Sequence, residues 1–209
     1  DKITGKRKDL CGVQDMFPVF QPHFGDSSMS ITVTAFTVPT RESVSPTNQG
    51  LFDQLKKGLG MVPNLYATLA HSETALGDYL TLQNRKSSLS AKQREVINLV
   101  VSQVNECQYC LAAHTVLGKM RGFTDDQVLE LRRGRASFNI DLDTLARFVK
   151  SVAENRGKVS DDERAELLDA GFTQENVVDI VIAIGDKIIT NYLHNITEIP
   201  VDFPAAPAI

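Results

Sequence analysis

The stretch Ser90–His114 has the sequence SAKQREVINLVVSQVNECQYCLAAH and contains the signals that decide the fold. Ser90, followed three residues later by Gln93, fits a capping box, which satisfies the free backbone N–H groups at the start of a helix. Apolar residues then recur at helical spacing: Val96, Leu99, Val100 and Val104. The pattern predicts an amphipathic helix over residues 91–104 and a second helix from residue 107.

The second helix carries a CxxC motif followed by a histidine. Spacings of 3, 4 and 7 residues put Cys107, Cys110 and His114 on one face. Only a thiolate attacks, and the unpaired N–H groups at a helix start lower the pKa of a CxxC thiol below the usual value of about 8.5. The three side chains can supply a thiolate, a resolving thiol and a proton carrier, so we infer a thiol redox site.

Helical signals continue through most of the chain. Thr124–Gln127 and Ser160–Glu163 fit the same capping box, and glycines follow several apolar runs where helices should end. We predict helices over residues 48–58, 63–70, 73–86, 91–104, 107–120, 125–133, 142–155, 161–169 and 174–194. No convincing series of strands occurs between Met29 and Ile209, and the predicted fold class is all-α.

A weak internal repeat links two helical corners. Residues 122–128 (GFTDDQV) resemble residues 171–177 (GFTQENV), with Gly, Phe, Thr and Val in matching places. In each copy a glycine would end one helix and a threonine would cap the next, while the phenylalanine packs at the corner. Two copies suggest a duplicated helix-turn-helix unit, although two unrelated helical corners can share these features.

Composition excludes several classes of function. The 209 residues carry a net charge of −4, so a nucleic-acid-binding surface is not expected. The longest apolar cluster, Val177–Ile189, is interrupted by Asp179, Gly185, Asp186 and Lys187, so it predicts a buried helix and not a membrane span. No glycine-rich phosphate loop is present, so a bound nucleotide or flavin is not indicated.

Cysteine usage favours a reducing compartment. Of three cysteines, two form the CxxC motif, which is too few for a secreted disulfide framework. We therefore expect a cytoplasmic protein.

The first residues differ from the rest of the chain. Residues 1–28 show no helical periodicity and no capping signals, so we interpret them as a non-native or disordered extension. Residues 29–209 are predicted to form a single all-α domain. Within it, the alternating segment Ile31–Phe36 could be an edge strand or a docking arm.

The core motif resembles that of the alkylhydroperoxidase D-like proteins in the carboxymuconolactone decarboxylase superfamily. That motif has a glutamate, a CxxC twelve residues later and a histidine seven residues after the first cysteine. Glu95, Cys107, Cys110 and His114 fit all four places. Residues 60–66 (GMVPNLY) and the C-terminal segment 191–204 also resemble the peroxidase-related members.

The resemblance implies an all-helical fold, a homo-oligomer (trimer or hexamer) and a thiol-dependent hydroperoxide reductase with an antioxidant role. Its partners would be a hydroperoxide substrate and an external dithiol or reducing protein. Cys110 would be the attacking thiol, Cys107 the resolving thiol, and His114 with Glu95 the proton relay. Decarboxylase members lack the CxxC motif, so its presence argues against lactone decarboxylation.

One position departs from the founding members, which have a histidine just before the second cysteine. This chain has Tyr109 there. A phenol titrates near about 10 and is a poorer proton shuttle at neutral pH than an imidazole. The departure shortens the expected relay and puts the use of the founding members' lipoylated partner in doubt.

The residues alone leave alternatives open. The CxxC motif could reduce the disulfide of a partner protein, or could pack as two small buried side chains. Cys107, Cys110, His114 and one carboxylate could form a zinc site in a non-catalytic helical module, although a lone CxxC lacks the usual second ligand pair.

Three further side chains have ordinary explanations. Glu95, beside an apolar stripe, could be a solvated edge residue. Glu106 is a second candidate carboxylate but suits an ordinary first-turn acid. His194 could line the pocket or complement the helix dipole at a C-terminus.

Overall fold

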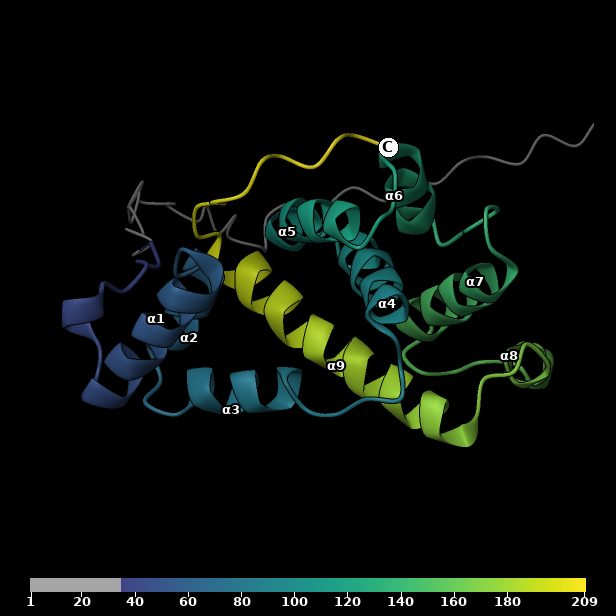
Figure 1. Cartoon of the computed structure of the whole chain (residues 1–209), viewed down its shortest axis with the longest axis horizontal. Coiled ribbons are helices and arrows are strands. Elements are labelled where there is room, and N and C mark those ends of the chain that lie inside the picture. The colour runs from purple at the N-terminus through teal and green to yellow at the C-terminus, as the bar shows by residue number, and fades with distance from the viewer. Residues whose placement is uncertain (1–34) are drawn as a thin grey trace, which may run out of the picture. The chain divides into compact units, whose positions relative to one another are not determined.

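The helix predicted after Ser90 is α4 (Ala91–Val104), which contacts four other helices of the fold (Figure 1). The computed structural model describes residues 35–209. The helices around α4 are α5 (Gln108–Met120), α6 (Asp125–Arg132), α7 (Ile140–Glu154) and α9 (Gln174–Thr197). Because α4 is enclosed in this way, its burial extends beyond a single stripe and includes Val96, Ile97, Leu99, Val100 and Val101.

The other elements precede α4 or cover α7. They are a 3-10 helix (Arg41–Ser43), α1 (Pro46–Leu59), α2 (Asn64–Leu69), α3 (Ala75–Gln83) and α8 (Asp161–Asp169). Residues 35–209 thus contain nine α-helices and no strand, which confirms the all-α prediction. Every predicted helix is present, with its ends within three residues of the expected positions.

Both copies of the internal repeat form the same corner. Phe123 N–H donates to the carbonyl of Gly118 across the α5–α6 corner, and Phe172 N–H donates to that of Leu167 across the α8–α9 corner. The glycine of each copy has a positive φ, and a capping box follows, as it also does at Ser90 and Ser160. The local geometry is shared, while duplication of the whole unit stays a prediction.

Helix α9 joins two groups of helices. The first residues of the fold form a separate apolar cluster, which includes Phe52, Leu55, Leu69, Leu76 and Tyr79. In Figure 1 the long helix α9 runs from α7 and α8 to α1 and α2, and it contacts α2, α3, α4, α5 and α7. Side chains on α9 can therefore reach the space between both groups.

Some sequence predictions concern residues that the structure does not describe. The predicted extension, residues 1–28, lies outside the described residues, as do residues 29–34. Of the possible strand or arm at 31–36, only Ala35 and Phe36 are described, and both are exposed and belong to no helix or strand. Residues 35–209 form one compact unit. Among them, no helix has the length and apolar character needed to cross a membrane.

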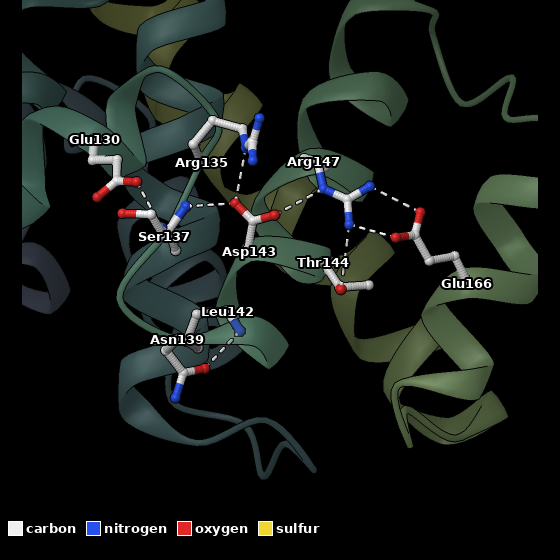
Figure 2. A network of polar contacts seen from close by, with 10 residues as sticks. Glu130, Arg135, Ser137, Asn139, Leu142, Asp143, Thr144, Arg147 and Glu166 are labelled. Carbon is white, nitrogen blue, oxygen red and sulfur yellow. Dashed lines mark hydrogen bonds and ion pairs between the residues drawn. The ribbon is translucent and has the colours of Figure 1, made fainter.

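A polar network holds α7 against its neighbours (Figure 2). The Asp143 carboxylate accepts hydrogen bonds from the Ala136 backbone N–H (2.8 Å), from Arg135 (2.9 Å) and from Arg147 (3.0 Å). Arg147 also pairs with Glu166 on α8. Burial would raise the pKa of Asp143, but these donors together lower it below its usual range.

Substitution Asp143→Ala leaves the buried Ala136 N–H without its acceptor. We expect the free energy of unfolding to fall by about 1–3 kcal/mol, measured by denaturant titration. Asp141→Ala is the matched control, because Asp141 has the same charge in the same turn but is exposed. Its expected change is within about 0.5 kcal/mol. If both variants lost the same free energy of unfolding, the negative charge near the helix start, and not the network, would be the source of the stability.

Candidate active site

The corner between α4 and α5 fixes the first cysteine. Asn105 ends α4, and Glu106 adopts the left-handed conformation with φ 53°. Cys107 N–H then donates to the carbonyl of Ser102 at 3.0 Å, as in a Schellman motif. Glu106 is exposed at this turn, which does not support it as a second carboxylate of the site.

Cys107 caps α5 and lies against Cys110. The helix begins at Gln108, one residue later than predicted, and the Cys107 Sγ accepts the Cys110 backbone N–H at 3.4 Å. The relative exposures of the two side chains are 0% and 2%, and both thiols are free. The structure thus brings the two cysteines together as the spacing predicts.

Glu95 and His114 form a buried pair between α4 and α5. Glu95 Oε1 lies 2.7 Å from His114 Nδ1, and both side chains are buried. Burial would raise the pKa of Glu95, but the contact with His114 and the charge of Lys187 outweigh it and lower that pKa. The interpretation of Glu95 as a solvated edge residue is therefore wrong.

Lys187, on α9, extends this pair. Its Nζ lies 2.8 Å from His114 Nε2, and only 3% of the residue is exposed. In the sequence, Lys187 stands out only as an interruption of an apolar run. A usable signal was present, because buried polar residues follow one face of α9 at spacings of 3, 4 and 7: Lys187, Thr190, Asn191 and His194.

Cys110 and Lys187 line the same cavity, which has a volume of about 380 Å³. Its walls are mostly apolar or aromatic and include Leu59, Met61, Tyr66, Tyr79, Tyr109 and Phe203. His114 and Glu95 instead line a second, more polar cavity with Arg94 and Asn98. The thiol lines one cavity and the Glu95–His114 pair lines the other, while Leu59, Tyr66 and Leu117 line both. Lys187 lines the thiol cavity and contacts His114.

The two cysteines differ sharply in acidity. Burial opposes ionisation of Cys110, yet its pKa is lowered to about 5. The largest cause is a hydrogen bond from Cys107, and the positive charge of Lys187 adds to it. The same hydrogen bond, together with burial, raises the pKa of Cys107 far above that of a free thiol. Cys110 is thus the thiolate at neutral pH, while Cys107 keeps its proton.

The chain is similar to known proteins in sequence and in fold. Residues 70–141, which contain Glu95, both cysteines and His114, match the carboxymuconolactone decarboxylase family. An uncharacterised peroxidase-related protein from Silicibacter sp. TM1040 has a similar structure, with a TM-score of 0.69 and 25% identity over 80% of this chain and 91% of that one. These two findings support a relationship to the AhpD-like carboxymuconolactone decarboxylase superfamily, with the sequence match confined to residues 70–141.

Two other solved structures have a fold similar to that of this chain. An AhpD-core, peroxidase-related protein from Ralstonia eutropha JMP134 has a TM-score of 0.73 at 20% identity, over 80% of this chain and 91% of that one. The debrominase Bmp8, in complex with 2,3,4-tribromopyrrole, has a TM-score of 0.67 at 14% identity, over 82% and 93%. At these identities the likeness concerns the fold alone. No curated protein matches the sequence.

Tyr109 has a structural role. Its hydroxyl donates to Asp202 Oδ1 (2.5 Å) and accepts the Leu65 N–H (3.2 Å), while Asp202 also accepts the Asn64 N–H (2.8 Å). Burial, followed by the bond to Asp202, raises the pKa of Tyr109 well above its usual value. The phenol keeps its proton and ties the C-terminal segment to the start of α2, so it does not replace a histidine in a proton relay.

His194 belongs to the same layer as Tyr109. The two rings lie 5.4 Å apart, and His194 Nε2 lies 3.2 Å from the carbonyl of Ile199. His194 is absent from the residues that line either cavity described above. Its place near the end of α9 supports packing of the C-terminal segment and not a role as a pocket-lining residue.

The zinc alternative lacks a ligand set. In the part of the chain that the structure describes, no three His, Cys, Asp or Glu side chains come together in a way that could hold a metal ion. Three or four such ligands are the usual minimum for zinc.

The hydrogen bond between the cysteines can be tested by titration of the thiols. The third cysteine of the chain, Cys11, is first replaced by serine, so that only the two site thiols titrate. We expect one thiolate with a midpoint near pH 5, followed by ultraviolet absorbance. Cys107→Ala removes the donor and should move the midpoint toward the free value of about 8.5. An unchanged midpoint in Cys107→Ala would mean that Cys107 does not stabilise the thiolate.

Proposed function

We propose that this protein is a thiol-dependent hydroperoxide reductase. The observation that carries the proposal is a free Cys110 that lines a cavity, with the free Cys107 beside it at the cap of the same helix. The lowered pKa of Cys110 and the raised pKa of Cys107 favour Cys110 as the thiolate. A thiolate is the attacking species in peroxide reduction, and a neighbouring thiol is what a sulfenic acid needs in order to form a disulfide.

In the proposed reaction, the Cys110 thiolate attacks the distal oxygen of the hydroperoxide and the O–O bond breaks. Cys110 becomes a sulfenic acid, and the released alkoxide takes a proton to leave as an alcohol. The Cys107 thiol then attacks the sulfenic sulfur, water leaves, and a Cys107–Cys110 disulfide forms. An external dithiol that can enter the cavity restores both thiols through a mixed disulfide.

The positions of the residues suit this cycle. Cys107 is the cap of α5 and not part of its interior, so a small rotation can bring its sulfur to bonding distance of Cys110 without breaking the helix. The Glu95–His114 pair, held together by its 2.7 Å contact, reaches the thiol cavity through the contact of His114 with Lys187. The apolar and aromatic cavity walls favour an organic hydroperoxide as the substrate.

Reduction of a partner protein's disulfide is less well supported. Cys107 has no exposed surface and Cys110 has 2%. A folded partner would have to bring its disulfide to a buried sulfur, whereas a small hydroperoxide needs only to enter the cavity.

Substitution of each cysteine separates the two proposed steps. Cys110→Ser should abolish reduction of cumene hydroperoxide, since an alcohol replaces the thiolate. Cys107→Ser should complete one attack and then accumulate the sulfenic acid, detected by mass spectrometry after trapping with a diketone. Cys11→Ser is the matched control and should keep the wild-type rate. Full activity in Cys110→Ser would overturn the proposal.

We also propose a homo-oligomer, a trimer or hexamer, in the cytoplasm. Large apolar side chains are exposed along one long face of α9 and would be covered in such an assembly: Val178, Val181, Ile182, Ile189, Tyr192 and Ile196. Light scattering of the purified protein tests this. A monomer at micromolar concentration would contradict it.

A further inference from the structure

We propose that Lys187 is the catalytic group that faces Cys110 and donates the proton to the leaving oxygen, while His114 and Glu95 are positioning residues that act through Lys187. This inference rests on the proposed hydroperoxide reduction and gives that site a further residue. It also changes the role that the family resemblance implies for His114, from direct partner of Cys110 to support for Lys187.

The cavity that Cys110 lines is also lined by Lys187 and not by His114. Lys187 and Cys110 line one cavity, and His114 lines the other. Among the described residues that line the Cys110 cavity, Lys187 is the only charged side chain. A hydroperoxide that reaches the Cys110 sulfur would therefore meet the Lys187 side chain and not the imidazole.

Each ring nitrogen of His114 already has a partner. Nδ1 lies 2.7 Å from Glu95 Oε1, and Nε2 lies 2.8 Å from Lys187 Nζ. Whichever of Lys187 and His114 holds the shared proton, both ring nitrogens are occupied and neither is free to take a proton from Cys110. The chain of contacts runs from Glu95 through His114 to Lys187, so Lys187 is its last member on the side of the thiol.

The chemistry of an ammonium group fits this place. A protonated lysine has three N–H donors, of which the contact with His114 uses one. The others can point to the thiolate and to the leaving oxygen in a site with little water, where a positive charge strongly stabilises developing negative charge. Isolated burial of a lysine is costly, and the neighbouring Cys110 thiolate and Glu95 carboxylate provide the opposite charge.

Protons balance over the proposed cycle. As the Cys110 sulfur bonds to the distal oxygen and the O–O bond breaks, the alkoxide takes a proton from the Lys187 ammonium and leaves as an alcohol. Disulfide formation then releases water, with its protons supplied by the Cys107 thiol and the sulfenic acid. When the external dithiol reduces the disulfide, Cys110 leaves as a thiolate, and the proton set free returns to Lys187.

The main test compares Lys187→Met with His114→Gln in single-turnover reactions with cumene hydroperoxide, at a pH where Cys110 is ionised in every variant. Loss of a general acid typically lowers the rate 10²- to 10⁴-fold, and we expect at least about 10²-fold for Lys187→Met, with a smaller loss for His114→Gln. In Lys187→Ala, small primary amines should restore part of the rate in proportion to their acidity. A wild-type rate in Lys187→Met, or a greater loss in His114→Gln, would overturn the inference.

Lys119→Met is the matched control, because Lys119 is exposed on α5 and pairs only with Asp125. It should keep the wild-type rate. Circular dichroism identifies a variant that fails to fold, in which case Lys187→Arg replaces it. Arginine keeps the positive charge but does not give up its proton, so the rate should still fall at least about 10²-fold.

Alkylation of Cys110 tests Lys187 without any hydroperoxide. A cation in the cavity should favour anionic iodoacetate over neutral iodoacetamide, and this preference should fall in Lys187→Met but persist in His114→Gln. If the wild-type protein reduces no hydroperoxide, the proposed function fails, while the alkylation ratio still decides whether Lys187 faces the thiolate. An unchanged ratio in Lys187→Met would overturn the inference by itself.

Discussion

A buried polar line, Glu95–His114–Lys187, joins three helices, and the position of the thiol site depends on it. Each member comes from a different helix (α4, α5 and α9), so the contacts at 2.7 and 2.8 Å fix the rotation of these helices relative to one another. Breaking such a line by removing one member leaves a buried charge or donor without its partner, which typically costs several kcal/mol. The helices are therefore held where Lys187 and Cys110 line one cavity.

The same helices are also fixed by their ends. The left-handed turn at Glu106 ends α4 and places Cys107 as the cap of α5, which leaves its sulfur beside that of Cys110. On the other side, Tyr109 and Asp202 tie the C-terminal segment to the start of α2, and Phe203 of that segment lines the cavity. The cap at Cys107 and the packing of the C-terminal segment thus produce a cavity around a single reactive sulfur. The apolar walls of this cavity limit competing reactions with water.

Local sequence signals were sufficient to predict the helices and the CxxC motif with its histidine. Capping boxes at Ser90, Thr124 and Ser160 and the apolar spacing between them depend on neighbours within one or two turns, so the helix ends could be predicted closely. The same holds for the cysteines and His114, which lie on one helix. The burial of Glu95 was harder to predict, because a position beside an apolar stripe is equally typical of a solvated edge residue. Only the packing of α4 against α5 buries it.

The sequence by itself determined nine helices, their caps and the three site residues that share α5, because these features follow from periodicity and from backbone groups close in the chain. Only the tertiary structure decided that Lys187 meets His114 across 73 residues and that Tyr109 binds Asp202 across 93. It also decided that the thiol and the imidazole face different cavities. These outcomes depend on how α9 and the C-terminal segment pack against α4 and α5, and such long-range packing leaves no local pattern in the sequence.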